Sequence, residues 1–286
     1  MIIWLASYPK SGNTWLRFYI LSLLVGKKKD INLSHLKAIV AYPHSTHFKG
    51  LVSDLFDLDE IAKNWIVSQE KMNSNKHLRF FKTHNMLGKY KGHPFTDYEN
   101  TLGTIYIVRD PRNVITSLKN HYSLSDYSEA KKFMFDENKI LAMSERQKNL
   151  FMKSKIFPLK QIVGSWKTNY LSWKYMNKNY LLVKYEDLVE NPKNEFTKIA
   201  DFIGNLLKLK FTEDQIDKAI NLSSFEKLEK MEKESGFTES TVNKEGFKNK
   251  FFFLGPKNDW TKILDPEISN EINKKFEKEM KELKYL

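Results

Sequence analysis

The sequence contains no cysteine and no long apolar run, and these two absences already narrow the class of protein. With zero cysteines in 286 residues, disulfides, cysteine nucleophiles and thiolate metal sites are excluded. The longest apolar candidate, residues 18–25, is far shorter than the roughly 18 residues that mark a membrane-spanning helix. No basic segment precedes an apolar one at the N-terminus, as it would in a signal peptide. We therefore expect a cytoplasmic protein without a membrane span.

The sequence also lacks internal repeats, low-complexity tracts and any motif typical of nucleic-acid binding. Its net charge is +12, and a basic protein attracts anions. Much of the excess is lysine spread over predicted helices, for example at residues 274–281, which is typical of solvated helix faces. No basic stretch carries the interleaved aromatic residues that would track a nucleic-acid strand. We therefore expect no nucleic-acid partner.

What is present indicates an α/β fold. The chain is long enough, and at 41% hydrophobic apolar enough, to bury a full core. Strand-like runs such as residues 180–184 alternate with helix patterns such as residues 195–204, which is typical of a parallel sheet with crossover helices. The second pattern predicts a helix that ends on a glycine C-cap. Two irregular segments, at about 123–160 and 233–250, are typical of lids or acceptor-binding insertions. We expect one P-loop-like domain over residues 1–286, with a central, mostly parallel sheet flanked by helices.

The most informative segment is the first strand-to-helix junction, where residues 7–15 read S-Y-P-K-S-G-N-T-W. In a Walker-type phosphate loop, backbone N–H groups and the helix N-terminus cradle phosphate, and a lysine after the second glycine reaches the terminal phosphates. Here Asn13 occupies that lysine position, and Lys10 lies inside the loop instead. This arrangement disfavours an ordinary ATP or GTP hydrolase. It suits an anionic ligand whose leaving group needs a positive charge.

A second junction carries side chains that suit a phosphate monoester. Residues 104–108 predict a strand that ends in Arg109, Asp110 and Pro111. Asp is a good helix cap, and Pro suits the first helical turn. Ser117 follows eight residues after Arg109, two turns into the predicted helix. A guanidinium group with a hydroxyl group is a sensible pair for binding phosphate.

A candidate general base follows a third apolar run, residues 78–81. Lys82 and His84 lie at the end of this run. Histidine accepts a proton near neutral pH because its unperturbed pKa is about 6.5. Six other histidines compete for the role, but His84 alone lies directly after a strand between the two phosphate segments.

These segments resemble the motifs of the sulfotransferase family. Members transfer a sulfuryl group from 3′-phosphoadenosine 5′-phosphosulfate (PAPS) to an acceptor hydroxyl or amine, leaving 3′,5′-adenosine bisphosphate (PAP). The resemblance covers nearly the whole chain and is strongest at residues 7–15 and 109–117. It implies that His84 is the catalytic base, that Lys10 stabilises the leaving group and that Lys82 assists on the sulfuryl oxygens. It also implies that no metal is required.

The resemblance further implies a set of cofactor-binding residues. The first loop would hold the 5′-phosphate, Arg109 and Ser117 the 3′-phosphate, and Tyr185 would lie beside the adenosine. Residues 223–225 resemble the element that contacts adenine, with Trp15 on the other side of the base. The implied set is Lys10, Ser11, Gly12, Asn13, Thr14, Trp15, Arg109, Ser117, Tyr185, Ser223, Ser224, Phe225, Gly255 and Lys257.

One segment departs from the family pattern. Many members carry Arg-Lys-Gly near the C-terminus, and its basic pair binds the 3′-phosphate. Here Phe253 and Leu254 precede Gly255, so the expected 3′-phosphate clamp is incomplete. The lysines near enough in sequence to substitute are Lys248, Lys250 and Lys257.

Several questions stay open from the sequence. A P-loop kinase that uses ATP with Mg²⁺ and a non-catalytic polyanion-binding protein are the alternatives to a sulfotransferase. The acceptor, a small molecule or a glycan that bears a hydroxyl, leaves no readable signature. The sequence does not decide between a monomer and a homodimer.

Overall fold

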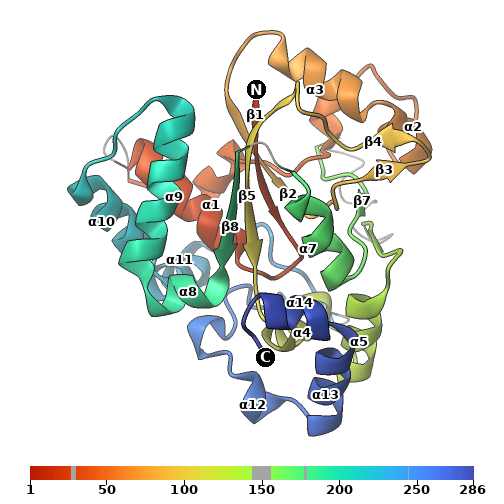
Figure 1. Ribbon diagram of the computed structural model, residues 1–286, viewed down its shortest axis with the longest axis vertical. Helices are drawn as coiled ribbons and strands as arrows, with labels where there is room; N and C mark the ends of the chain where they lie inside the picture. The colour runs from red at the N-terminus through yellow and green to blue at the C-terminus, as the bar shows by residue number, and fades with distance from the viewer. Residues whose placement is uncertain (27–29, 144–155, 177–178, 244) are drawn as a thin grey trace. The chain divides into compact units, whose positions relative to one another are not determined.

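The computed structural model describes residues 1–26, 30–143, 156–176, 179–243 and 245–286. By its contacts the chain separates into two compact units. Unit 1 comprises residues 1–8, 39–106 and 137–182. Unit 2 comprises residues 9–38, 107–136 and 183–286. Figure 1 colours the chain by residue number, so the segments of each unit can be followed there.

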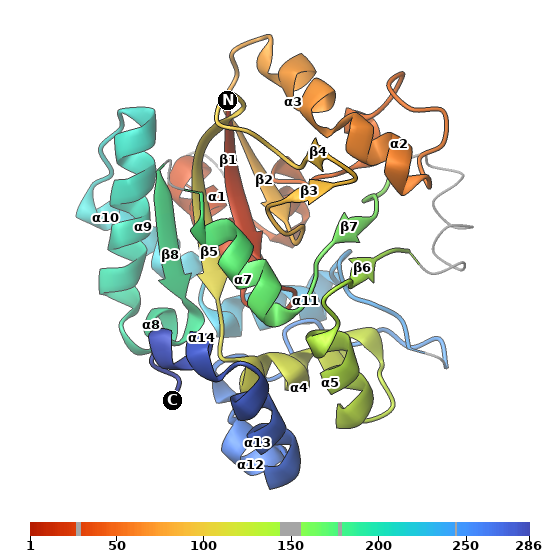
Figure 2. The same cartoon turned by 45° about the vertical axis from the view of Figure 1, so that its right-hand side comes forward.

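A four-stranded sheet forms the framework of unit 1. Its strands are ordered β2-β1-β5-β8 (Figure 2). Strands β1 and β2 pair in parallel, with Trp4 opposite Phe81. Strands β5 and β8 run on at their C-terminal ends into the residues of unit 2. The predicted α/β class with a central parallel sheet flanked by helices is confirmed. The bounds are β1 Ile2–Ser7, β2 Arg79–Thr83, β5 Thr101–Val108 and β8 Tyr180–Lys184.

The other regular elements of unit 1 are short. Helix α7 packs against β1, as Figure 2 shows. Strands β3 and β4 form one antiparallel pair, and β6 and β7 form another. The bounds are η2 Ser45–His47, α2 Leu58–Lys63, α3 Trp65–Asn73, β3 Lys89–Tyr90, β4 His93–Pro94, β6 Ile140–Leu141, β7 Gln161–Ile162 and α7 Trp166–Lys174.

The core of unit 1 is built around Trp4. Every residue of β1 is buried, as expected for a strand that is covered on both faces. The Trp4 ring lies 5.3 Å from the rings of Tyr42 and Phe95, and 6.3 Å from that of Trp173. Its indole N–H donates to Thr101 Oγ1 over 3.0 Å, so the buried polar atom is satisfied.

Unit 2 is mainly helical. Helix α1 contacts α10, which in turn contacts α9, and a second group is formed by α4, α5 and α13 (Figure 1). The bounds are α1 Asn13–Val25, η1 Leu33–Ala38, α4 Pro111–Tyr122, α5 Tyr127–Phe135, α8 Tyr185–Glu190, α9 Pro192–Leu207, α10 Glu213–Leu222, α11 Phe225–Ser235, η3 Gly255–Lys257, α12 Trp260–Ile263, α13 Pro266–Lys275 and α14 Glu277–Glu282.

One face of α1 packs into an apolar cluster of unit 2. Phe18 and Leu21 from α1 meet Leu228 from α11 and two aromatic residues of the following segment, Phe237 and Phe252. Removing this much apolar surface from water is the main driving force that holds these elements together. The cluster therefore joins the helix that follows the first loop to the segment around residue 252.

The end of α9 differs from the prediction. The helix does not stop at Gly204 but runs to Leu207, and Lys208 closes it with a left-handed φ of 55°. Gly204 lies beneath the returning chain instead. A Cβ at this position would stand 2.7 Å from the carbonyl oxygen of Leu209, whose N–H donates to the Gly204 carbonyl. Gly204 therefore leaves room for the turn that caps the helix, while Lys208 is the left-handed residue of that cap.

The two expected insertions contain more regular structure than their composition predicted. In the first, α5 starts at a cap formed by Asp126, which accepts a hydrogen bond from the Glu129 N–H. Residues 144–155 of that segment lie outside the described residues. In the second, α11 continues to Ser235, and a β-bridge pairs Val242 with Lys248. Whether either segment is a lid stays a prediction.

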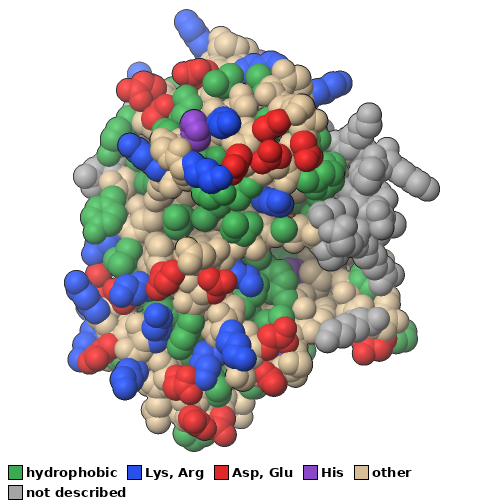
Figure 3. All heavy atoms as spheres, turned by 90° about the vertical axis from the view of Figure 1, so that its right-hand side faces the viewer, with side chains coloured by type: hydrophobic (Ala, Val, Ile, Leu, Met, Phe, Trp, Pro, Cys, Tyr) green, Lys and Arg blue, Asp and Glu red, His purple; other side chains and the backbone are tan. Residues whose placement is uncertain are grey.

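Charges of both signs are intermixed on the face of the molecule that Figure 3 draws. Figure 3 shows Lys and Arg interspersed with Asp and Glu on the face in view. In unit 2, Lys193 pairs with both Glu213 and Asp217. This pattern matches the expectation that much of the lysine excess belongs to solvated helix faces. Among the residues that the structure places, none of the helices combines the length and hydropathy of a membrane crossing.

Candidate functional site

The start of α1 has the shape of an anion-binding loop. Gly12 is the N-cap residue and has a φ of 103°, a conformation that disfavours any residue with a Cβ. A Cβ on Gly12 would lie 2.7 Å from the Tyr185 ring, so both the backbone and the packing require glycine. Because glycine has no side chain, the cap residue itself cannot occupy the N–H groups of the first turn.

The Ser11 hydroxyl fits the same interpretation. Ser11 is fully buried, and its Oγ has no hydrogen-bond partner among the described residues. A buried hydroxyl normally finds a partner, so an exception beside a glycine-capped helix start suggests a ligand contact. A phosphate at a helix N-terminus would accept hydrogen bonds from such groups and be favoured by the helix dipole.

The structure brings together several predicted 3′-phosphate and adenosine residues within unit 2. Arg109 Nη1 lies 3.4 Å from Ser117 Oγ and 3.4 Å from the Lys10 carbonyl oxygen. Arg109 Nη2 donates to the carbonyl of Gly255 over 3.2 Å. The guanidinium group lies 4.0 Å from the centre of the Tyr185 ring, a cation–π geometry. Arg109 is therefore the residue at which the first loop, α4, Tyr185 and the Gly255 segment meet.

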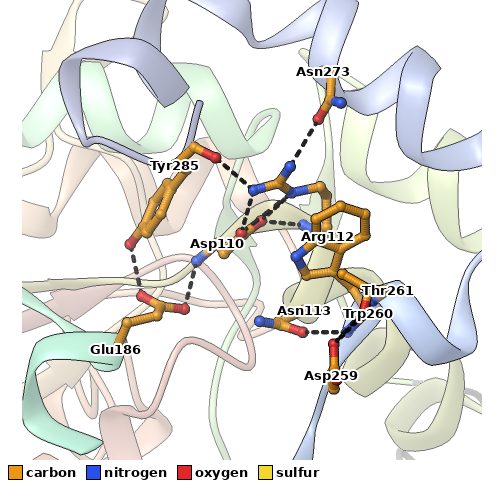
Figure 4. A network of polar contacts seen from close by, with 9 residues as sticks. All are labelled: Asp110, Arg112, Asn113, Glu186, Asp259, Trp260, Thr261, Asn273 and Tyr285. Atoms are coloured by element: carbon orange, nitrogen blue, oxygen red, sulfur yellow. Dashed lines mark hydrogen bonds and ion pairs between the residues drawn. The ribbon is translucent and has the colours of Figure 1, made fainter. Parts of the chain in front are cut away.

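A polar network braces the turn directly after Arg109 (Figure 4). Asp110 caps α4 by accepting a hydrogen bond from the Arg112 N–H, and it forms a buried ion pair with the Arg112 side chain at 2.7 Å. The Arg112 guanidinium also donates to the Tyr285 carbonyl over 2.7 Å and stacks on Trp260 at 4.0 Å. The sequence indicates the cap at Asp110, but no local pattern indicates the long-range contacts of Arg112 with Tyr285 and Trp260.

Glu186 links this network to Tyr185. Its carboxylate accepts hydrogen bonds from the Asp110 N–H at 3.0 Å and from the Tyr285 hydroxyl at 2.8 Å. Burial raises the pKa of the Glu186 carboxyl above its ordinary value. The Asp110 hydrogen bond, the charge of Arg109 and the Tyr285 hydroxyl oppose that rise. The segment predicted to contact adenosine is thus tied to the turn predicted to contact the 3′-phosphate.

The predicted adenine element uses its hydroxyls locally. Ser223 Oγ donates to the carbonyl of Ala219 over 2.9 Å, and Ser224 caps α11. The Phe225 ring lies against Gly255, where an added Cβ would stand 2.1 Å from it. Phe225 and Trp15 both pack against the apolar cluster around Phe18. The two aromatic residues expected to flank adenine therefore border one cluster, whereas the serine side chains hold the turn.

His84 is held in one orientation within unit 1. Its Nδ1 lies 2.8 Å from the Ser7 carbonyl oxygen and 3.2 Å from Ser7 Oγ. A carbonyl oxygen only accepts, so Nδ1 carries the proton and Nε2 is the nitrogen that can accept one. The backbone is also held, because the His84 N–H donates to Gln161 Oε1 over 2.7 Å and Asn169 Nδ2 donates to the His84 carbonyl over 2.9 Å. Lys82 lies two residues earlier in β2.

The lysines expected to replace the missing basic pair are on the surface. Lys250 forms an ion pair with Glu229, and Lys248 and Lys257 are exposed. Phe253, at one of the basic positions, is 43% exposed. A role for any of these lysines at the 3′-phosphate stays a prediction. Over the described parts of the chain, no three His, Asp or Glu side chains gather in an arrangement that could hold a metal ion.

The fold and the geometry define an α/β protein with a glycine-capped loop at one strand-to-helix junction and an Arg–Ser pair at another. The chain matches the sulfotransferase domain family over residues 2–284. It is 25% identical over 280 residues to flavonol 3-sulfotransferase from Flaveria bidentis, covering 97% of this chain and 81% of that protein. It is also 25% identical over 281 residues to 3-beta-hydroxysteroid sulfotransferase from Cavia porcellus, covering 96% and 82%.

Solved structures agree with this assignment at the level of the fold. The mouse sulfotransferase SULT7A1, complexed with PAP, matches with a TM-score of 0.59 at 19% identity, covering 98% of this chain and 84% of that one. The chain belongs to the sulfotransferase family, and the family resemblance of its motifs is confirmed.

Proposed function

We propose that this sulfotransferase transfers a sulfuryl group from PAPS to the hydroxyl of a small molecule. The observation that carries the proposal is the meeting of Arg109 with Ser117 and the first loop, which supports a ligand with two phosphate groups. The orphaned Ser11 hydroxyl and the glycine-capped start of α1 fit the 5′-phosphate. The names of the relatives, a flavonol and a hydroxysteroid sulfotransferase, support a small hydroxyl compound as acceptor.

The residues divide the chemistry between proton removal and charge stabilisation. PAPS, when bound, supplies the sulfuryl group and a phosphate that leaves. His84 Nε2 takes the proton of the acceptor hydroxyl as its oxygen bonds to sulfur, and the Ser7 carbonyl holds the tautomer that leaves Nε2 as the acceptor. The Lys10 ammonium stabilises the negative charge on the departing phosphate oxygen. Lys82 assists on the sulfuryl oxygens. We propose no metal in this mechanism.

Replacing His84 tests the assignment of the base. For His84→Ala we expect turnover of a flavonol or a hydroxysteroid with radiolabelled PAPS to fall by about 10²- to 10⁴-fold, the usual contribution of general base catalysis. Affinity for PAP, measured by calorimetry, should stay within about twofold, because neither phosphate would contact the imidazole. The exposed His77 provides the matched control, His77→Ala, which should keep wild-type turnover. Retained turnover in His84→Ala would remove His84 from the role of base.

A further inference from the structure

The side chain of Lys10 lies on an aromatic ring of the segment that departs from the family pattern. Its Nζ is 3.8 Å from the centre of the Phe251 ring. Lys10 itself has a left-handed φ of 66°, which few residues other than glycine adopt. The left-handed backbone at Lys10 therefore sets the direction of its side chain, and the ammonium group lies over the Phe251 ring.

The Phe251 ring is held firmly from the side of α11. The Phe251 N–H donates to Glu232 Oε1 over 2.7 Å, and the Phe252 N–H donates to Glu232 Oε2 over 2.9 Å. The Phe251 ring also packs edge-on against Phe237 at 4.9 Å and against Phe252 at 5.2 Å. One carboxylate and two aromatic neighbours thus fix the position of the ring.

Contacts with α4 fix the same segment from a second direction. Asn120 Nδ2 donates to the Lys250 carbonyl over 3.0 Å, and the His121 ring meets the Phe251 ring edge-on at 5.6 Å. Ser117 lies one helical turn before His121 on α4. The ring under Lys10 is therefore anchored to the helix that carries the predicted 3′-phosphate contact.

We propose that Phe251 is a positioning residue for Lys10, a claim that rests on the catalytic role proposed above for that lysine. An aromatic face attracts an ammonium group through its quadrupole, yet it carries no net charge. The ring therefore orients the ammonium group of Lys10 and itself adds no negative charge beside the leaving oxygen.

Nuclear magnetic resonance on ¹³C-methylated lysines tests the contact itself, without any cofactor. The Lys10 signal, assigned by its loss in Lys10→Arg, should show an upfield ring-current displacement in the wild-type protein. Phe251→Leu should abolish this displacement and Phe251→Tyr should retain it. The proposal is overturned if the Lys10 signal has the same position in Phe251→Leu as in the wild type.

Kinetics test the consequence. Phe251→Leu should lower kcat by about 2- to 30-fold, the range expected for losing one cation–π contact, and Phe251→Tyr should restore it. Affinity for PAP should fall by no more than the same factor, because the leaving oxygen that Lys10 stabilises belongs to the 5′-phosphate of PAP, whereas a general loss of structure would remove binding altogether. Phe247→Leu is the control, because Phe247 is 71% exposed in the same segment. An unchanged kcat in Phe251→Leu, or equal impairment in Phe251→Tyr, would overturn the proposal.

The resonance and kinetic experiments together distinguish a failure of the positioning role from a failure of the proposed function. If the wild-type protein neither binds PAP nor uses PAPS, the proposed function fails, and the resonance experiment still decides whether Lys10 is positioned by the ring. If PAP binds and sulfuryl transfer occurs, failure of Phe251→Leu to change the Lys10 signal or kcat removes only the positioning role. Thermal denaturation of each variant confirms that folded proteins are compared.

Discussion

The starts of α1 and α4 carry the two predicted phosphate contacts in opposite ways. At α1 the cap residue is Gly12, which offers no side chain to the first-turn amides. At α4 the cap residue is Asp110, whose carboxylate already accepts a hydrogen bond from the Arg112 N–H. An anion at α1 can therefore be bound by backbone N–H groups, whereas an anion at α4 must be bound by side chains.

This difference explains why an aromatic ring packs against the turn before α1, whereas a polar network holds the turn before α4. Around Gly12 the close approach of the Tyr185 ring shapes the loop. Around Asp110 a network through Arg112, Glu186 and Tyr285 holds the backbone from which Arg109 projects. Binding a phosphate by backbone N–H groups requires a precise loop conformation. Binding a phosphate by the Arg109 side chain requires a rigid backbone beneath that residue.

The largest effect should come from breaking the support at α4. Asp110→Ala leaves the buried Arg112 guanidinium without its carboxylate, which should lower the free energy of unfolding by about 3–5 kcal/mol. Affinity for PAP should fall as well, because Arg109 loses its fixed backbone. Urea denaturation and calorimetry measure the two effects. Asp259→Ala is the control, since Asp259 caps α12 and its ion-pair partner Lys262 is exposed, so the substitution should cost about 1 kcal/mol. Equal losses in both variants would contradict the bracing role.

A smaller loss of stability should follow from adding one methyl group at Gly12, the cap residue of α1. Gly92 is the control, because it has a φ of 87° with open space around it. Gly92→Ala should therefore cost only the backbone strain, about 1–2 kcal/mol. Gly12→Ala adds a clash with the Tyr185 ring and should cost about 1–3 kcal/mol more in unfolding free energy. It should also abolish PAP binding in calorimetry, which Gly92→Ala should retain. If Gly12→Ala binds PAP as the wild type does, the loop does not hold the phosphate.

The smallest effect should be a pH dependence at Glu186. Because burial raises the pKa of this carboxyl in the folded protein, its contribution to stability is greatest below the ordinary pKa. That contribution is lost as the pH rises toward the raised value. Glu186→Gln has no charge to bury. Its free energy of unfolding should therefore rise relative to that of the wild type as the pH increases from about 4 to about 8. Urea denaturation at several pH values checks this, and a constant difference between the two proteins would contradict it.

Much of the local framework was predictable from sequence because it depends on short-range chemistry. The strand at 180–184, the cap at Asp110 and the start of α1 follow from apolar runs and cap residues. Strand β5 starts three residues before the predicted 104–108, since Thr101 is buried as the partner of the Trp4 indole. The prediction that Gly204 ends α9 was wrong, because Lys208 is the left-handed residue and Gly204 lies in the last turn, beneath the chain that folds back over it.

The candidate site was predictable only in part for the same reason. The residue types at 7–15 and 109–117 predict the phosphate contacts, because loop chemistry and spacing are local. The contacts of Tyr285 with Glu186 and of Phe251 with Lys10 join residues far apart in the chain. No spacing rule predicts such pairs, so the bracing of Arg109 and the ring beneath Lys10 appear only in the structure.

The central claim is that two separate turns bind two separate phosphates of one nucleotide. Calorimetric titration with PAP, beside 5′-AMP and ATP with Mg²⁺, tests it most directly. We predict that PAP binds about 10- to 150-fold more tightly than 5′-AMP, the value of a charged hydrogen bond at the 3′-phosphate, and that Arg109→Gln removes this difference. Equal affinity for PAP and 5′-AMP in the wild-type protein, or a preference for ATP, would contradict the claim.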